Sequence, residues 1–264
     1  MLDLKNVTKT FSAGTVNQHH ALRHLDLHLD RGEFVTIVGS NGAGKSTLFN
    51  AICGNYLLEE GTIHLDQRDI TFLSEHRRAR VIGRVFQDPM KGTAPHLTIE
   101  ENLALAYTRK DRKPFRSAIK KQERELFQEE LAKYHMDLEN RMKTKVGLLS
   151  GGQRQVVTLL MCTLVMPKLL LLDEHTAALD PATAEQVMEI TKTVVRENNL
   201  TTMMITHNLA SALSTGSRTI MLDEGQIMLD LSGEEREKLT VNELLDCYAQ
   251  KKKKAFDNDR ALLI

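Results

Sequence analysis

A glycine-rich stretch at residues 39–47 has the residue types and the spacing that bind a polyphosphate. It matches G-x-x-x-x-G-K-[ST] at Gly39, Gly44, Lys45 and Ser46, between an apolar run typical of a strand and a sequence typical of a helix. Because glycines carry no side chain, the backbone N–H groups and the positive end of the following helix can point at an anion. We expect Lys45 to reach the β and γ phosphates of a nucleoside triphosphate and Ser46 to bind Mg²⁺. The predicted nucleotide-binding segment comprises Gly39, Ser40, Asn41, Gly42, Ala43, Gly44, Lys45, Ser46 and Thr47.

Two carboxylates, Asp173 and Glu174, follow a run of leucines at residues 169–172. Such a run suits a central strand of a parallel sheet, and both acids would emerge at the carboxyl end of that strand. Asp173 is a candidate ligand of Mg²⁺, whereas Glu174, outside the metal shell, can accept a proton from an attacking water. The pair therefore predicts hydrolysis of the bound nucleotide.

Two further polar residues, Gln87 and His207, come directly after predicted strands. In open α/β sheets, ligands lie off the carboxyl ends of the strands, so a parallel sheet would bring Gln87 beside the phosphate loop. His207 would lie at the same edge as Glu174 and contact the γ-phosphate. By residue pattern alone, each could equally be an ordinary polar residue at a strand end.

A second candidate anion site precedes the apolar helix predicted at 154–166, which Pro167 ends. A serine and two glycines at a helix N-terminus can bind an anion by the same physics as the first loop. The residues of this site are Ser150, Gly151, Gly152 and Gln153. Phe11, which follows the first predicted strand, could stack on a flat base or simply pack against its neighbours.

Strands and helices that could position these residues alternate along the chain. A capping box at Thr98 and Glu101 opens a helix at 102–109, and a second helix is expected at 117–135, so this region is a helical insertion. Asp180 is expected to cap the helix that starts at Pro181. The predicted strands lie at 2–7, 22–29, 34–38, 61–66, 81–86, 168–173, 202–206, 218–222 and 226–231.

The ends of the chain are predicted from local patterns. His24 and His28 alternate with apolar residues and are expected to face solvent rather than bind a metal. Another capping box, at Thr240 and Glu243, opens a last helix, and the lysine run 251–254 is expected to begin a mobile tail.

Length and composition restrict the class of protein. The 264 residues, 41% of them hydrophobic, suffice for one large α/β domain. Lysine plus arginine equals aspartate plus glutamate, 35 each, so charge does not suggest a nucleic-acid partner. The three cysteines form no C-x-x-C pair, which favours a reduced, cytosolic protein. The sequence contains no apolar stretch of membrane-spanning length, so a role at a membrane would require a partner.

The order of these motifs resembles the nucleotide-binding subunits of ATP-binding cassette (ABC) transporters from about Leu2 to about Leu231. The motifs that carry the resemblance are the phosphate loop, Gln87, Leu149–Gln153, the leucine run with Asp173 and Glu174, Ala178–Asp180 and His207. In that family they are the Walker A loop, the Q-loop, the signature, Walker B with the catalytic glutamate, the D-loop and the switch histidine. His175 stands where many relatives have proline.

The resemblance implies a fold and a division of the chain into subdomains. It implies an α/β P-loop NTPase core with an N-terminal antiparallel β subdomain and an inserted helical subdomain. One ABC ATPase domain would span 1–264: β subdomain and core at 1–89 and 160–232, the helical subdomain with the signature at 90–159, and a C-terminal helix and basic tail at 233–264.

The resemblance also assigns roles at the site. Phe11 would lie under adenine, and Ser46, Gln87 and Asp173 would hold Mg²⁺, with Gln87 acting through a water. Lys45, Gln87, Glu174 and His207 would be the catalytic residues. Family members dimerise head to tail, so the signature of one copy would close on the ATP of the other, and Asp180 would contribute to the same nucleotide site.

Partners and location follow from the resemblance as expectations. They are a second copy of the chain, transmembrane permease subunits bound through Gln87 and the loop 88–97, an extracytoplasmic solute-binding protein, and the cytoplasmic face of the cell membrane. The segments 86–95, 98–103 and 173–180 look like those of a bacterial importer branch associated with tryptophan or tyrosine uptake.

Other classes of protein can be compared with this pattern. A GTPase would need N-K-x-D, which the sequence lacks, and chromosome-organising or translation-type cassette proteins would carry a long coiled coil or two such domains. An ABC exporter, or a soluble cassette ATPase without a transport role, remains the alternative at this stage.

Overall fold

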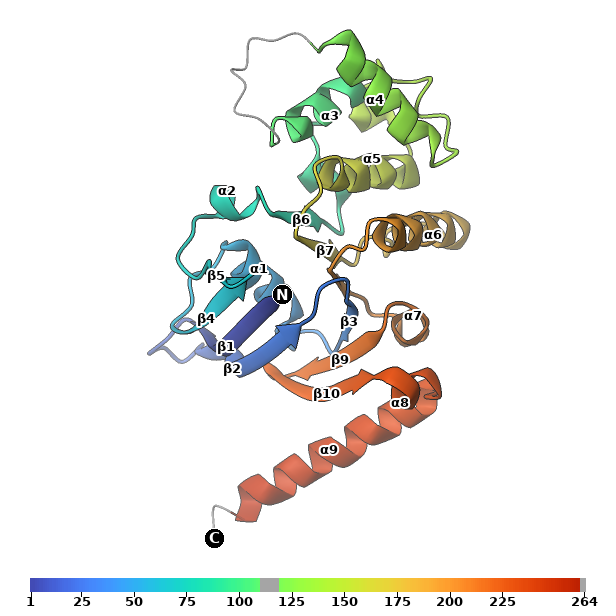
Figure 1. Ribbon diagram of the computed structural model, residues 1–264. Coiled ribbons are helices and arrows are strands. Elements are labelled where there is room, and N and C mark those ends of the chain that lie inside the picture. The colour runs from blue at the N-terminus through green and yellow to red at the C-terminus, as the bar shows by residue number, and fades with distance from the viewer. Residues whose placement is uncertain (110–118, 262–264) are drawn as a thin grey trace. The chain divides into compact units, whose positions relative to one another are not determined.

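The computed structural model describes residues 1–109 and 119–261, apart from the side chains of 254–261. The chain forms two compact units, Met1–Arg78 with Thr201–Ile264, and Ala79–Leu200 (Figure 1). The phosphate loop therefore belongs to the first unit, and the acidic strand end belongs to the second.

The first unit contains two sheets and several helices. Its strands are β1 (Leu2–Phe11), β2 (His19–Leu29), β3 (Phe34–Val38), β4 (Glu60–Leu65), β5 (Arg68–Asp69), β8 (Thr202–Ile205), β9 (Arg218–Asp223) and β10 (Gln226–Ser232). Its helices are α1 (Lys45–Cys53), α2 (Glu75–Arg78), α7 (Leu209–Ser214), α8 (Gly233–Glu237) and α9 (Val241–Ala261).

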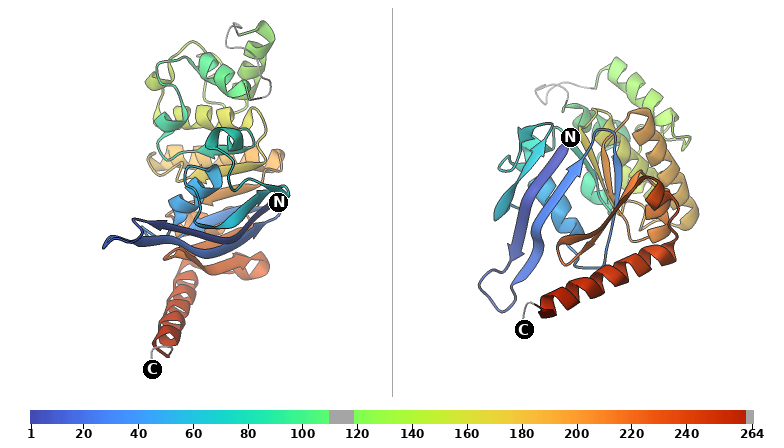
Figure 2. Two further views of the ribbon diagram at one scale, coloured as in Figure 1. Left: turned by 90° about the vertical axis from the view of Figure 1, so that its left-hand side faces the viewer. Right: turned by 60° about the horizontal axis from the view of Figure 1, so that its bottom comes forward.

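The antiparallel sheet of the first unit has the order β2-β1-β4-β5. Along β2, buried leucines such as Leu25 and Leu27 alternate with the exposed residues His24, Asp26 and His28. Period-two alternation gives a sheet with one buried and one solvated face. The prediction that these histidines face solvent is confirmed. β1 and β2 pair antiparallel and run side by side in Figure 2.

Four neighbouring strands of the second sheet belong to the first unit, in the order β10-β9-β3-β8. β3 runs parallel to β8 and β9, and all five of its residues are buried, as expected of a continuous apolar run. The predicted hairpin of β9 and β10 is confirmed. α9 packs on this sheet through Leu244, which belongs to a buried cluster with Val38 and Leu229 (Figure 2).

The second unit combines a parallel strand pair with helices. Its elements are β6 (Ile82–Val85), β7 (Leu169–Asp173), α3 (Ile99–Tyr107), α4 (Lys121–Ala132), α5 (Gly151–Thr163), α6 (Pro181–Glu197) and the 3₁₀ turns η1 (Pro89–Gly92) and η2 (Val146–Leu148). The capping box of Thr98 and Glu101 is confirmed at α3. Phe127 and Leu131 of α4 are fully buried, so the apolar stripe of that helix faces the core of this unit.

Two local predictions differ from the structure. A third, the helix start at Ser117, lies outside the described residues. α5 begins at Gly151 rather than Arg154, because Ser150 and Gln153 form a capping box. The lysine run that was expected to begin a mobile tail lies within α9, which continues to Ala261, and the mobility of this segment stays a prediction. No glycine or proline interrupts Val241–Ala261, which explains the continuous helix.

Within the described ranges, the helices are all too short or too polar to cross a bilayer. The finer division of the domain at residues 90 and 160 stays a prediction.

Candidate functional site

The phosphate loop lies in the first unit, between β3 and α1, and packing fixes its backbone. Gly39 has φ 151°, and a Cβ there would lie 2.2 Å from the carbonyl oxygen of Leu222. Gly44 has φ 102°, and a Cβ there would lie 2.4 Å from the carbonyl oxygen of Ala21. Only glycine fits at such positions, because they combine a left-handed or extended positive φ with a close backbone neighbour. The two glycines thus let the loop curl tightly before α1 begins.

Lys45 is buried at the first position of α1, with 5% of its surface exposed. Its Nζ donates to the carbonyl oxygens of Gly39 at 2.7 Å and of Ser40 at 2.8 Å. The ammonium therefore lies against the loop that precedes it, whereas Ser46 is exposed and Thr47 half-buried. A fixed positive charge and exposed hydroxyl groups at a helix N-terminus suit a polyphosphate ligand.

Asp223 connects the phosphate loop with the C-terminal helix inside the first unit. Its carboxylate accepts hydrogen bonds from Ser40 Oγ at 3.4 Å, Tyr248 Oη at 2.8 Å and Lys252 Nζ at 2.7 Å. Burial raises the pKa of Asp223, but hydrogen bonds from Lys252 and Tyr248 outweigh burial and bring that pKa below its usual value. No local sequence pattern indicates this contact, because it depends on where α9 packs.

His207 and Phe11 also belong to the first unit. His207 follows β8, which runs parallel to β3 with Ile205 opposite Ile37, so the histidine and the phosphate loop both follow the carboxyl ends of neighbouring strands. Phe11 ends β1, and its ring contacts Tyr56 edge-on with 5.2 Å between centroids. The structure thus brings His207 to the loop edge of the sheet, while the role of Phe11 under adenine stays a prediction.

Asp173 and Gln87 follow the two parallel strands of the second unit. Leu172 of β7 pairs with Val85 of β6, so Asp173 and Gln87 lie at the same strand edge. Asp173 accepts a hydrogen bond from Arg84 at 2.6 Å through Oδ2, and both side chains are largely buried. The Arg84 guanidinium also lies 4.7 Å from the centroid of the Phe86 ring.

Arg84 was not among the predicted site residues. The available signal was a positive charge within an otherwise apolar strand at 81–86. A charge on a buried strand needs a partner, and a carboxylate at the end of the neighbouring strand is a suitable one.

The turn after Asp173 contains Glu174 and His175. Glu174 is half-buried and has φ 48°, a left-handed conformation that is uncommon for residues other than glycine. His175 is 2% exposed, and its Nε2 lies 3.1 Å from Thr191 Oγ1 in α6. Burial lowers the pKa of His175 to about 4, so its imidazole is neutral at neutral pH. His175 is therefore part of the interior of this unit rather than of its surface.

The Ser150–Gln153 segment starts α5 and packs against the start of α6. Ser150 Oγ accepts from the Gln153 backbone N–H at 3.2 Å, and Gln153 Oε1 accepts from the Ser150 N–H at 3.2 Å. A Cβ at Gly152 would lie 2.2 Å from Thr183 Cγ2. Gly152 is thus needed for helix packing, in addition to any role toward an anion.

Asp180 caps α6 as predicted, with its carboxylate accepting from the Thr183 N–H at 3.1 Å. Hydrogen bonds from the Thr183 side chain and backbone lower the pKa of Asp180, so the cap is ionised at neutral pH. The structure brings Asp180 and the Ser150–Gln153 segment to the same end of this unit, through the contact of Gly152 with Thr183.

The predicted Mg²⁺ ligands have a donor set that fits this ion. Ser46, Gln87 and Asp173 offer oxygen atoms, and Mg²⁺ binds few protein carboxylates alongside waters and substrate phosphates. Residues 1–109 and 119–261 contain no cluster of three or more His, Cys, Asp or Glu side chains that could hold a metal by themselves.

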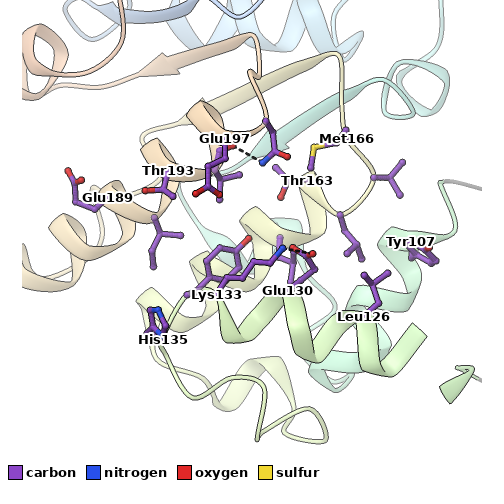
Figure 3. A pocket seen from close by; sticks show the side chains of 17 residues that line it. Tyr107, Leu126, Glu130, Lys133, His135, Thr163, Met166, Glu189, Thr193 and Glu197 are labelled. Carbon is purple, nitrogen blue, oxygen red and sulfur yellow. Dashed lines mark hydrogen bonds and ion pairs between the residues drawn. The ribbon is translucent and has the colours of Figure 1, made fainter. Parts of the chain in front are cut away.

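A cavity of about 770 Å³ lies in the second unit between α4, the end of α5 and α6 (Figure 3). Leu126 and Met166 form part of its apolar lining, and Lys133 pairs there with Glu130 at 2.6 Å. None of the predicted site residues lines it. The cavity is therefore separate from both halves of the candidate site.

Comparisons with known proteins agree with the motif order. Residues 22–177 match the protein family described as "ABC transporter". The chain is 45% identical to a tyrosine transport ATP-binding protein of Clostridioides difficile (strain R20291), over 94% of this chain and 98% of that relative. It is 32% identical to a thiamine import ATP-binding protein of Photorhabdus laumondii, over 87% of this chain and 90% of that relative.

Solved structures show the same architecture. A dimeric ATP-binding cassette in a post-hydrolysis state, bound to ADP and Pi, has a TM-score of 0.74 and 32% identity, covering 88% of this chain and 98% of that one. A subunit of an ABC transporter complex from Clostridium perfringens has a TM-score of 0.75 and 25% identity, covering 93% of this chain and 92% of that one. The α/β cassette fold predicted from the motifs is thus confirmed.

Proposed function

The chain belongs to the ABC transporter family, and from this premise we propose that it powers an importer of aromatic amino acids, with tyrosine as the first candidate substrate. As a family member it binds and hydrolyses ATP on behalf of a membrane transporter. The observation that carries the choice of substrate is the 45% identity to a tyrosine transport ATP-binding protein over nearly the whole of both chains. The similarity to a thiamine import protein supports import over export.

The phosphate loop is the proposed binding site for the phosphates of ATP. Lys45 would bind the β and γ phosphates, and the N–H groups of residues 39–47 would bind the remaining phosphate oxygens. The buried position of Lys45 and its contacts with Gly39 and Ser40 support this role, because the charge is already held at the loop. Mg²⁺ held by Ser46, Asp173 and a water on Gln87 would neutralise phosphate charge. Phe11 would stack on the adenine ring.

Glu174 is the proposed general base. It would orient a water in line with the γ-phosphate and accept its proton, while His207 would donate a hydrogen bond to the same phosphate. The positions of both residues after parallel strands support these roles, since ligands lie at that edge of α/β sheets.

A second copy of the chain would complete each ATP site. The Ser150–Gln153 segment of one copy would close over the ATP held by the phosphate loop of the other, with Asp180 nearby. The exposure of Ser150 at the start of α5 supports this, because the helix N-terminus is accessible to an anion. The dimeric state of a similar cassette is a second line of support.

The loop 88–97 is the proposed contact with permease subunits. Asn102, fully buried, fixes this loop by accepting from the Ala94 N–H at 2.7 Å and donating to the Ala94 carbonyl at 3.0 Å. Met90 is 38% exposed on the neighbouring turn η1. A rigid loop with an exposed methionine, directly after Gln87, suits a surface that passes changes at the ATP site to a partner. Such a complex would hold the chain at the cytoplasmic face of the membrane, and an extracytoplasmic solute-binding protein would deliver the substrate.

Reconstitution tests the proposed function. The chain would be purified together with its membrane partners, placed in lipid vesicles and assayed for uptake of radiolabelled tyrosine with ATP on the side of this subunit. We expect ATP-dependent tyrosine uptake that unlabelled tryptophan reduces and thiamine does not, with Glu174→Gln as the matched inactive complex. Uptake equal to that of the Glu174→Gln complex, or efflux of tyrosine instead, would overturn the proposal.

A further inference from the structure

His175 follows the proposed general base directly, yet its side chain points into the second unit. Glu174 is half-buried at the end of β7, whereas His175 is 2% exposed. The polar contact recorded for its ring in the described chain is with Thr191, in the third turn of α6. This contact connects the residue after Glu174 with α6, the helix that Asp180 caps.

The direction of the hydrogen bond follows from the donors available. Thr191 has a single hydroxyl proton, and its Oγ1 donates to the Val187 carbonyl at 2.8 Å in the preceding turn of α6. With that proton directed at the Val187 carbonyl, Oγ1 accepts from His175, which corresponds to the Nε2–H tautomer. The 3.1 Å contact holds the imidazole against α6.

The backbone at Glu174 needs such support. Its φ is 48°, in the left-handed region that side chains disfavour. Such a conformation persists only where the surrounding structure stabilises it. The Ala177 N–H donates to the Glu174 carbonyl at 2.9 Å, which closes the turn on one side. The buried ring of His175 anchors the peptide on the other side.

We propose that His175, through its hydrogen bond to Thr191, is a positioning residue that sets the direction of the Glu174 carboxylate. It does not touch the nucleotide or the attacking water. The inference rests on the proposed catalytic role of Glu174. A ring fixed to α6 restricts the rotation of the peptide between residues 174 and 175, and a small error in the position of a catalytic group is enough to slow a reaction strongly.

A pair of substitutions in α6 tests this role while leaving both His175 and Glu174 in place. Thr191→Val removes the acceptor at nearly constant volume, and Thr191→Ser keeps it. Thr193→Val makes the same change two residues away, on the opposite face of the helix, and is the matched control. We expect Thr191→Val to lower kcat for ATP about tenfold with KM and ATP affinity unchanged, Thr191→Ser to restore most of the rate, and Thr193→Val to have no effect.

Two results would overturn the proposal: a parental kcat in folded Thr191→Val, or a loss of kcat that parallels a loss of ATP affinity and is not restored by Thr191→Ser. Glu174→Gln and the double variant, measured in parallel, separate this proposal from its premise. If Glu174→Gln keeps the parental rate, the premise fails. If Glu174→Gln is slow but Thr191→Val slows it about tenfold further, the premise stands and the positioning role of His175 is wrong.

Discussion

The phosphate loop of the first unit and the acidic turn of the second unit both follow a buried parallel strand, but they hold their polar groups by different means. In the phosphate loop, Gly39 and Gly44 let the backbone fold back closely, and Lys45 bonds to carbonyl groups of the same loop. In the acidic turn, side chains from other elements hold the carboxylate region: Arg84 contacts Asp173, and Thr191 contacts His175.

The two regions differ in whether residues close in the sequence or distant in the sequence determine the geometry of the polar groups. The glycines and the lysine of the phosphate loop all lie within nine consecutive residues, although Ala21 and Leu222 pack against that loop, so changes inside the segment should decide whether ATP binds. The geometry of the acidic turn depends on β6 and α6, so changes outside the motif should alter the rate or the stability without removing a catalytic atom. Substitutions in the motifs themselves should act on ATP binding and hydrolysis, whereas substitutions at contacts between distant residues should act on stability.

The largest effect is expected from Lys45→Ala, which removes the charge at the centre of the phosphate loop. We expect ATP binding to become undetectable in the micromolar range and hydrolysis to fall about 10³-fold, because no other side chain of the loop carries a positive charge. Titration with a fluorescent ATP analogue checks this. Lys238→Ala, at the exposed lysine that directly follows α8, is the control. ATP affinity at the parental level in Lys45→Ala would refute the proposed role of Lys45 in phosphate binding.

Ser150→Arg is expected to separate binding from hydrolysis. The larger, charged side chain would block closure on a second copy, so hydrolysis should fall at least about 10²-fold while isolated monomers bind ATP as before. Steady-state hydrolysis and monomer titration below the dimerisation concentration measure the two quantities. Weakened ATP binding in monomers would show that the segment acts within its own chain.

Arg84→Met removes the partner of Asp173 and should act on stability. Both side chains are less than 15% exposed, at 12% and 14%, so the carboxylate would be left without its hydrogen bond in a mostly buried position. We expect a loss of about 1–3 kcal/mol in the free energy of unfolding, measured in urea. Arg80→Met, at an exposed arginine of the same unit, should change it by less than about 0.5 kcal/mol. Equal effects for both variants would contradict the importance of the ion pair.

The smallest effect is expected from Asp223→Asn, which weakens the contacts of the C-terminal helix. Because the folded pKa of Asp223 is lowered, its stabilisation is present above the ordinary value of 3.8 and is lost as the pH falls through the folded pKa. The variant should therefore be about 1 kcal/mol less stable than the parent at pH 7, and the difference should shrink as the pH falls below 3.8 and disappear once the pH is below the lowered folded pKa. Urea titrations at several pH values test this, and a difference that is independent of pH would contradict it.

The same distinction explains what the sequence could predict. Buried strands, the phosphate loop and the capping boxes at Thr98 and Thr240 depend on neighbouring residues, and the structure confirms them. The helical conformation of the lysine run was not predicted, and this helix contacts Asp223, which is distant in the sequence. The Arg84 and Thr191 contacts depend on strand register and helix packing, which no local pattern contains.

The roles of the site residues stay predictions for a physical reason as well. Their proposed arrangement joins residues of both units and of a second copy, and no consecutive segment contains it. Measurements on ATP-bound protein are therefore the direct test.

The most direct measurement is the mass of Glu174→Gln in solution with ATP and with ADP. If Glu174 is the general base and the signature acts on the ATP of a second copy, this variant binds ATP, hydrolyses it at least about 10²-fold more slowly and remains a dimer. Light scattering on a sizing column should therefore give the mass of two chains with ATP and of one chain with ADP. A single chain with ATP, or turnover at the parental rate, would contradict a site shared between two copies and completed by Glu174.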